Sequence, residues 1–344
     1  MRKDPYYVAP AFCPMCKKEA SFVFLDNYSE RLTNGGDRKW SLYECRSCAV
    51  QFWLPLTVPK ANVYEEDVAY QGKGDVLSKE NAPAIVGGYW NARMFLKDFS
   101  AKDAAGKRLL DVGCGTGEFC FAARELGYTA EGVDFNQNAI AFARDKLGLE
   151  NVSAADVYAF LESKKEAYDI ITIFEVIEHV PDPGRLLDLA HDALKRGGTI
   201  VISTPNRGRH WRHISVRNEL WDFPYQHLSR WDMRSFRDFI ESHHFSAVRI
   251  KEELPTDWFV ERLRVIALHL SRKPAEGDRR SVSERTRSRI GFSRYQRLKN
   301  FVLGVCTIPA AIMYYALCFK GIHMYGVFIG TEDAGPNDIV GNKI

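Results

Sequence analysis

Four cysteines in two close pairs are the first feature of this sequence that can do chemistry. Cys13 and Cys16 form one CxxC pair, and Cys45 and Cys48 form another, with 28 residues between the pairs. Each pair can direct two thiolates at one ion, and two pairs complete the tetrahedral set of four sulfurs that structural zinc prefers. No further ligand or base accompanies the four, so we expect a closed Zn²⁺ site with a structural or substrate-positioning role.

Short strand-like runs lie between the cysteine pairs, at residues 22–25 and 40–44. A ribbon of this size has too small a core to fold alone, so the bound ion would supply the missing stability. A redox CxxC or a pair of disulfides is the alternative, but a thioredoxin-like motif requires a βαβ context that is absent here. The pattern therefore predicts a zinc ribbon over residues 1–60.

A glycine-rich turn follows an apolar, strand-like run that ends near Asp111. Its residues are Gly113, Cys114, Gly115, Thr116 and Gly117. Glycines in such a turn let the backbone approach a ligand closely, and a helical pattern over residues 118–126 follows. The GxGxG spacing differs by one residue from the GxGxxG of dinucleotide binders, which favours a ligand without a pyrophosphate.

The next strand-like run ends at Asp134, 21 residues beyond Gly113. A carboxylate at this spacing can accept hydrogen bonds from both hydroxyls of a ribose. Helices over 137–147 and 184–195 then alternate with strands over 152–155, 169–176 and 199–203. Alternation of this kind predicts a doubly wound α/β fold, which binds its ligands beyond the carboxyl ends of the strands.

Five sequence blocks in this region resemble the class I S-adenosylmethionine-dependent methyltransferases. They are LLDVGCGTGEF, GVDFNQNAI, YDIITIFEVIEHVPDP, GGTIVISTPN and PYQHLSRW, in this order within residues 89–245. The blocks are most similar to the ubiquinone-biosynthesis O-methyltransferase branch. The double CxxC in front of them resembles bacterial sugar and small-molecule methyltransferases with a zinc-binding front end. The resemblance implies a Rossmann-like, seven-stranded methyltransferase sheet and S-adenosyl-L-methionine as the cofactor.

The resemblance also implies roles for matching residues. The glycine turn would hold the methionyl part of the cofactor, Asp134 the ribose, and Asp156 with Val157 the adenine. Arg93 matches an arginine that binds the cofactor carboxylate in the ubiquinone branch, with a solvated helix-face arginine as the alternative. The full expected set of cofactor-binding residues is Arg93, Asp111, Gly113, Cys114, Gly115, Thr116, Gly117, Asp134, Phe135, Asp156, Val157, Phe174 and Glu175.

Three side chains are candidates for the chemical step. Methyl transfer to a hydroxyl needs positioning and a base, and a histidine can accept the proton. Glu178 and His179 follow the fourth strand directly, and His227 lies in a loop after the fifth strand. A structural hydrogen bond is the alternative role for either histidine. We expect no metal at this segment, because Glu175 stands where the HxxEH motif has its first histidine.

Composition limits the class of protein. A hydrophobic content of 46% and a charged content of 26% are typical of globular proteins and exclude fibrous, disordered and polytopic membrane classes. A net charge of +3 is too small for a surface that binds nucleic acid throughout. The N-terminus has no apolar run of signal-peptide length, so we expect a cytoplasmic protein with reduced thiols.

The C-terminal third contains an unusual insertion between two runs, 247–251 and 324–329, that are expected to close the sheet. Residues 272–299 are markedly basic, and residues 301–319 carry no charge. A membrane span here would separate the last strand from its sheet. Contact with an anionic membrane surface and a lid over the acceptor pocket stay open as readings, and RNA contact is a third.

The sequence thus predicts five regions. They are a zinc ribbon (1–60), a linker with a leading helix (61–105), the cofactor-binding core (106–253), the basic and apolar insertion (254–321), and a final strand with a tail (322–344). The expected activity is methyl transfer to an oxygen or carbon of a small acceptor, with lipid-linked and sugar-like compounds as candidates. The alternatives are a zinc-ribbon binding protein with a cofactor-sensing domain, and an RNA or protein methyltransferase.

Overall fold

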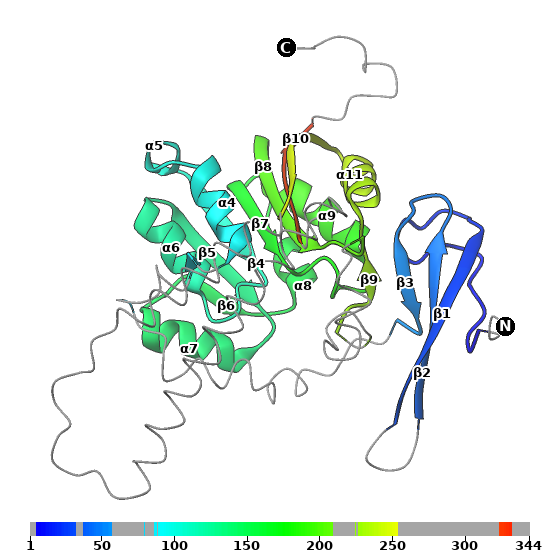
Figure 1. The fold of residues 1–344 in the computed structure, drawn as a ribbon. Helices are drawn as coiled ribbons and strands as arrows, with labels where there is room; N and C mark the ends of the chain where they lie inside the picture. The colour runs from blue at the N-terminus through cyan, green and yellow to red at the C-terminus, as the bar shows by residue number, and fades with distance from the viewer. Residues whose placement is uncertain are drawn as a thin grey trace, which may run out of the picture. The chain divides into compact units, whose positions relative to one another are not determined.

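A computed structural model describes residues 5–31, 37–56, 79, 86–87, 89–208, 224, 226–253 and 323–331 (Figure 1). The chain divides into two compact units, residues 1–251 with 323–344, and residues 252–322. The predicted basic and uncharged segments, 272–299 and 301–319, lie outside the described residues. Within the described ranges, no helix is both long enough and apolar enough to cross a membrane.

A seven-stranded sheet forms the centre of the first unit, with the order β10-β11-β8-β7-β4-β5-β6. Strands β4 to β8 run parallel along this order, and β11 pairs antiparallel with β8. This arrangement confirms the predicted fold class, including the two closing strands. The strands are β4 (Arg108–Val112), β5 (Thr129–Asp134), β6 (Val152–Ala154), β7 (Tyr168–Phe174), β8 (Leu194–Pro205), β10 (Phe245–Glu252) and β11 (His323–Gly330).

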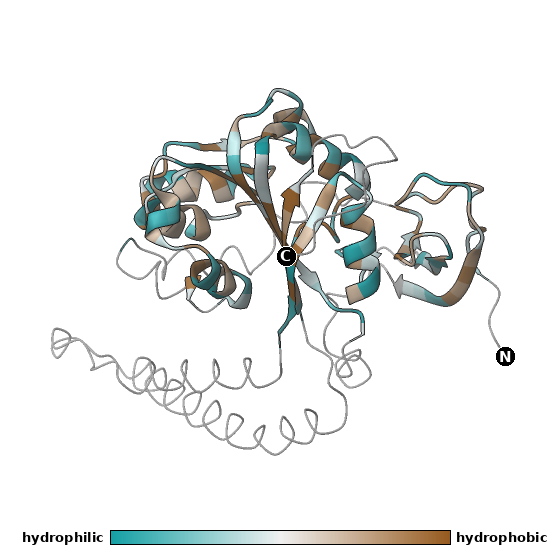
Figure 2. Cartoon of the chain, turned by 90° about the horizontal axis from the view of Figure 1, so that it is seen from above, coloured by the Kyte–Doolittle hydropathy of each residue, from teal (hydrophilic) through white to brown (hydrophobic). Residues whose placement is uncertain are grey.

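Alternate residues of the central strands point to opposite faces of the sheet, as strand geometry requires. Leu109 and Ile170 belong to one hydrophobic cluster, whereas Leu110 and Ile171 belong to another. The two clusters therefore mark the two covered faces, and hydrophobic residues run along the central strands in Figure 2. The covering helices are α4 (Trp90–Asp98), α5 (Ala101–Ala104), α6 (Glu118–Leu126), α7 (Gln137–Leu147), α8 (Val157–Glu162), α9 (Pro183–Ala193) and α11 (Met233–Glu241).

Side-chain caps place several helix starts directly after strand ends. Asn136 caps α7, Asp156 caps α8 and Asp182 caps α9, in each case by accepting a hydrogen bond from a backbone amide of the first turn. Helix α6 and helix α7 begin and end where the sequence predicted. Short polar residues at these positions thus end each strand on the same edge of the sheet.

Strand β8 differs from the prediction. A helix was expected to end at residue 195 and a strand to begin at residue 199, but β8 is continuous from Leu194 to Pro205. Its pairing with β7 steps from Tyr168–Leu194 to Ile170–Thr199, so the glycines form an irregularity inside the strand. The left-handed φ of 67° at Gly197 allows this bulge.

The N-terminal ribbon is a separate four-stranded sheet with the order β1-β2-β3-β9. Strands β1 (Phe22–Arg31) and β2 (Asp37–Cys45) are longer than the predicted runs, and β3 (Gln51–Leu54) was not predicted. The fourth strand, β9 (Ser229–Arg230), comes from a distant part of the chain. A two-residue strand has no pattern of its own, so the sequence offered no signal for it.

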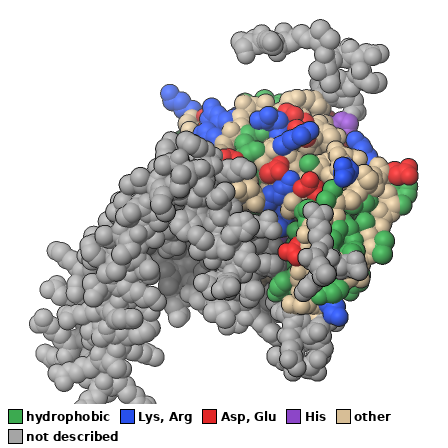
Figure 3. Space-filling view, turned by 45° about the vertical axis from the view of Figure 1, so that its right-hand side comes forward, with side chains coloured by type: hydrophobic (Ala, Val, Ile, Leu, Met, Phe, Trp, Pro, Cys, Tyr) green, Lys and Arg blue, Asp and Glu red, His purple; other side chains and the backbone are tan. Residues whose placement is uncertain are grey.

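Charges of both signs are mixed on the face of the molecule shown in Figure 3. Lys and Arg side chains lie beside Asp and Glu side chains on the described part of this face. The described part of this face therefore has no single-sign field to attract a polyanion.

Candidate active site

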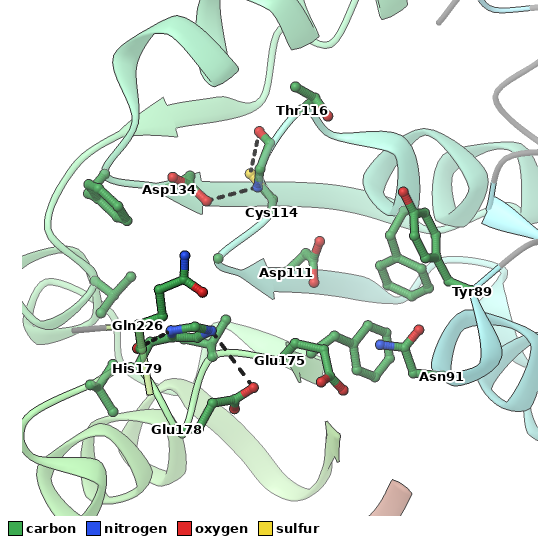
Figure 4. A pocket seen from close by; sticks show the side chains of 18 of the residues that line it. Tyr89, Asn91, Asp111, Cys114, Thr116, Asp134, Glu175, Glu178, His179 and Gln226 are labelled. Atoms are coloured by element: carbon green, nitrogen blue, oxygen red, sulfur yellow. Dashed lines mark hydrogen bonds and ion pairs between the residues drawn. The ribbon is translucent and has the colours of Figure 1, made fainter. Parts of the chain in front are cut away.

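A cavity of about 740 Å³ opens at the carboxyl ends of the parallel strands (Figure 4). Its volume lies within the range of about 300–1,000 Å³ that is usual for small-molecule sites. All the predicted cofactor-binding and catalytic residues line it, except Arg93 and Gly117. The cavity therefore brings together side chains from β4, β5 and β7 and from the segment before β9.

The glycine turn has a backbone conformation that residues other than glycine rarely adopt. Gly113, Gly115 and Gly117 have φ angles of 74°, 52° and 79°. A Cβ at Gly113 would lie 2.3 Å from Val176 Cγ2. Gly117 does not line the cavity but is the N-cap residue of α6. A Cβ at this position would lie 2.6 Å from Leu149 Cδ1. The turn thus needs glycine both for its conformation and for its close packing.

Substitution of Gly113 by alanine should separate these two requirements. Gly106 is the matched control, because its φ of 75° is similar but no atom lies within 4 Å of a Cβ there. We expect Gly106→Ala to cost only the conformational strain, about 1–2 kcal/mol of unfolding free energy. Gly113→Ala should cost more and should also weaken cofactor binding. Equal melting temperatures for the two variants, with equal cofactor affinity, would contradict this account.

The carboxylate of Asp134 is buried and held by the backbone. Its two oxygens accept hydrogen bonds from the amides of Gly115, at 2.9 Å, and Asn136, at 2.8 Å. Burial raises the pKa of Asp134, and these two hydrogen bonds act against the rise. Each oxygen keeps a second lone pair, so the residue fits the predicted role of accepting two ribose hydroxyls.

Asp111 lies deeper, at the end of β4. Thr172 Oγ1 donates to its Oδ1 at 2.7 Å, and Cys120 Sγ lies 3.8 Å from its Oδ2. Burial raises the pKa of Asp111 to about 7, despite the hydrogen bond from Thr172. Because this carboxyl lines the cavity, a bound cation would favour its charged form.

The other predicted cofactor residues lie around the same turn. Asp156 accepts a hydrogen bond from the Ala159 amide, and Val157 is the first residue of α8. The ring of Phe174 packs edge to face against Phe119, with the centroids 4.9 Å apart. Cys114, Thr116 and Phe135 complete the predicted set on the cavity wall.

Glu175 is held in an uncommon conformation at the end of β7. Its φ is 55°, which is rare for a residue with a side chain. Its Oε1 accepts a hydrogen bond from Ser203 Oγ at 2.7 Å, and its Oε2 lies 3.9 Å from His323 Nε2. Asn91 Nδ2 donates to the same Ser203 hydroxyl at 3.0 Å. The strained backbone thus places the carboxylate in a polar network on the cavity wall.

The two candidate histidines meet at the other side of the cavity. Their ring centroids lie 4.8 Å apart. A carboxylate oxygen of Glu178 and one ring nitrogen each of His179 and His227 all lie within 4.8 Å of one another. His179 Nδ1 lies 2.6 Å from the carbonyl oxygen of Gln226. Because a carbonyl only accepts, Nδ1 must carry the proton and Nε2 keeps a lone pair in the neutral ring.

The surroundings keep His179 neutral. Burial, and secondarily the neighbouring His227, lower the pKa of His179 from 6.5 to about 3, although the Gln226 carbonyl acts in the opposite direction. Glu178 is 1% exposed; its Oε2 accepts from Thr204 Oγ1 at 3.0 Å, and its Oε1 lies 3.8 Å from His179 Nε2. The arrangement offers a neutral imidazole with a lone pair on Nε2, next to a buried carboxylate.

Arg93 is not among the residues that line this cavity. Its guanidinium donates to the carbonyl of Gly87 at 3.0 Å. Sequence reasoning also missed lining residues. Tyr89 and Asn91 are near Arg93 in the sequence, so the leading helix was a usable signal, whereas His323 follows a long insertion that removes any local signal.

The four ribbon cysteines converge as their spacing predicted. Their sulfur atoms all lie within 4.8 Å of one another, and Cys13 Sγ is 4.0 Å from Cys48 Sγ. A tetrahedral zinc site with bonds of about 2.3 Å needs sulfurs about 3.8 Å apart. A hydrogen bond with Cys48 lowers the pKa of Cys13 to about 5, whereas burial raises the pKa of Cys16 to about 11. The donor set and its spacing fit zinc.

Comparison of the sequence with known proteins finds similarity to methyltransferases. Residues 91–250 match a family model described as a methyltransferase domain. A ubiquinone biosynthesis O-methyltransferase of Hydrogenovibrio crunogenus is 34% identical over 120 residues, which is 33% of this chain and 48% of that protein. Its counterpart in Thiobacillus denitrificans is 36% identical over 110 residues, or 30% of this chain and 46% of that protein. The chain thus spans about half the length of the curated relatives it matches.

A solved structure gives a further comparison. A SAM-dependent methyltransferase from Archaeoglobus fulgidus is 23% identical, with a TM-score of 0.46, and the match covers 77% of this chain and all of that one. The family match covers the residues that form the glycine turn, Asp134 and the histidine pair. Residues 91–250 of this chain are therefore similar to the methyltransferase domain family.

Proposed function

We propose that this protein transfers a methyl group from S-adenosylmethionine to an oxygen or carbon of a small acceptor. The observation that carries the proposal is the shared cavity, which contains both the glycine turn with Asp134 and a neutral histidine whose Nε2 keeps a lone pair. The names of the curated relatives favour oxygen as the acceptor atom. Lipid-linked and sugar-like hydroxyl compounds are the acceptors we propose to test.

The residues present fit the cofactor. The glycine turn leaves space for the methionyl part, and Asp134 has lone pairs for the ribose. Asp156 and Val157 line the same cavity, and we assign the adenine to them. Arg93 stays the proposed partner of the cofactor carboxylate. When bound, S-adenosylmethionine would supply a methyl group on a positively charged sulfur. The acceptor would attack the methyl carbon in line with the carbon–sulfur bond and displace the sulfur.

The chain's own part in the chemistry is positioning and proton removal. We assign the base to His179, because its Nδ1 proton is committed to the Gln226 carbonyl and its ring lines the cavity with a lone pair on Nε2. Glu178, 3.8 Å from Nε2, would stabilise the ring once it has taken a hydroxyl proton. His227 would orient the acceptor from the opposite segment.

An extract assay tests the activity. Protein with methyl-labelled S-adenosylmethionine should transfer label to a compound in a fractionated cell extract, and mass analysis would identify it. A cofactor-sensing protein would bind the cofactor but label nothing in any fraction, which would overturn the proposal. Label in RNA or protein fractions alone would favour those acceptors instead.

We also propose that the ribbon binds one structural zinc ion. Cys45→Ser should lose the metal, because three thiolates leave the tetrahedral set open. The methyltransferase domain should still melt cooperatively, since its core is large. Cys120→Ser is the matched control, because this buried cysteine lies outside the cluster, and it should keep the zinc. Metal analysis checks both variants, and full occupancy in Cys45→Ser would contradict the site.

A further inference from the structure

The acceptor side of the cavity is built from two chain segments that are distant in the sequence. One follows β7 and carries Glu178 and His179, and the other includes β9 and carries His227. The backbone amides of Leu228 and Ser229 donate to the Glu178 carbonyl at 2.8 and 3.1 Å. These bonds, with that from the His179 ring, tie the two segments together where the histidines meet.

The ribbon holds the second of these segments. Strand β3 pairs antiparallel with β9, where Phe52 lies opposite Ser229. The amide of Trp53 donates to the carbonyl of Leu228 at 3.0 Å. The two residues after His227 are therefore bonded to the Glu178 carbonyl through their amides and to the ribbon through β3.

The first cysteine knuckle contacts the other segment. Met15, between two of the cysteines, is fully buried in the same hydrophobic cluster as Ile177 and Val180, which flank the Glu178–His179 pair. Lys17 Nζ also lies 3.0 Å from Asp182 Oδ2. Because Lys17 is mostly exposed, this ion pair adds little energy, and the burial of Met15 in the shared cluster contributes more.

The cofactor side has separate support. The cluster that packs beneath the glycine turn contains Cys114, Phe121 and Ile140, and its described members all lie within residues 114–152. Asp134 is held by amides of the same region. No described ribbon residue belongs to this cluster, although Val112 and Val133 of the neighbouring strands belong to the larger cluster that contains Met15.

We propose that the metal-loaded ribbon is a positioning element for the acceptor side of the active site. The ion joins Cys13 and Cys16, on either side of Met15, to Cys45, which ends β2 next to β3. Loss of the ion frees both contacts with the histidine segments, because a ribbon of this size cannot keep its shape alone. This inference rests on the proposed zinc site, but not on His179 being the base.

Two measurements on the full-length protein report the two sides separately. Nitrogen NMR of ¹⁵N-labelled histidine reports which ring nitrogen of His179 carries the proton. Calorimetry with S-adenosylhomocysteine reports the cofactor side. When zinc is removed with a chelator, we expect the His179 and His227 signals to shift or broaden. The dissociation constant for S-adenosylhomocysteine should change by less than about twofold.

A variant that keeps all four cysteines separates docking from metal binding. Phe52→Leu weakens the packing of β3, where the side chain is fully buried, but leaves the zinc ligands in place. It should bind zinc normally and move the histidine signals in the same direction as chelation does. Lys39→Gln, an exposed change on β2, is the control and should leave the signals unchanged.

Three results would overturn the inference, and they differ in what else they refute. Unchanged histidine signals in zinc-free protein would refute the positioning role alone. A clear loss of S-adenosylhomocysteine affinity on chelation, together with the change in the histidine signals, would show that the whole protein is destabilised instead. Purified protein without zinc would refute the zinc site and this inference together, while leaving the methyl-transfer proposal in place.

Discussion

Replacing Asp134 by alanine is expected to weaken S-adenosylmethionine binding by about 2–4 kcal/mol, or roughly 30- to 1,000-fold in Kd. Two effects act in the same direction. The variant loses both acceptors for the ribose hydroxyls, and it leaves the amides of Gly115 and Asn136 without the carboxylate that orients them. Calorimetric titration with S-adenosylmethionine measures the loss directly.

Glu131→Gln is the matched control for this experiment. Glu131 lies on the same strand as Asp134, but it contacts Tyr168 and Lys164 and does not line the cavity. The Glu131→Gln variant should bind the cofactor with the wild-type affinity. Unchanged affinity in Asp134→Ala would refute the ribose assignment, and equal losses in both variants would indicate a general effect of strand β5.

The parts of the fold that were predictable have strong local signals. Helix α6 begins after Gly117 and ends before Gly127, and helix α7 lies between the cap residue Asn136 and Gly148. Glycines and a short polar cap mark such boundaries because they fit the backbone there better than other residues do. The central strands are apolar on both faces, as expected for a parallel sheet covered by helices.

The parts that were not predictable depend on contacts between distant segments. Strand β9 has two residues and exists only because β3 pairs with it. His323 reaches the cavity wall because β11 pairs with β8, after an insertion of about seventy residues in the second unit. Neither fact leaves a periodic pattern in the sequence, so local reasoning could not place these residues in the site.

The histidines show the same limit within the site itself. Their residue types and positions after strands were enough to name both as candidates, but not to separate catalysis from a structural hydrogen bond. The structure shows that His179 has the structural bond, through Nδ1 to Gln226, while its ring lines the cavity and keeps a lone pair on Nε2. The two roles belong to different atoms of one ring, which makes them separable by substitution.

Substitution of His179 by asparagine should lower the methyl-transfer rate by about 10²- to 10⁴-fold. The asparagine amide can still donate to the Gln226 carbonyl in place of Nδ1, but it offers no basic nitrogen. His191→Asn is the matched control, because the His191 ring is also bonded to a backbone carbonyl, that of Thr331, and lies outside the cavity. Full activity in His179→Asn would show that the ring is only structural.

The pH dependence of the wild-type protein tests the same assignment independently. With its pKa lowered to about 3, His179 stays neutral at pH 5.5, where a histidine of ordinary pKa would be about nine-tenths protonated. The transfer rate should therefore not fall tenfold between pH 7.5 and pH 5.5 on account of this residue.

The stability of the fold, in contrast to the transfer rate, should depend on pH through His179. Between about pH 3 and pH 6.5 the unfolded chain binds a proton at residue 179 that the folded protein does not, so the free energy of unfolding falls as pH decreases through this window. His179→Asn removes that contribution, whereas the other groups around the ring, Glu178 and His227, remain. Denaturant titrations from pH 4 to pH 7 should thus give the variant a shallower decline than wild type. Parallel curves would mean that His179 is not held neutral in the folded protein and that its pKa is not lowered.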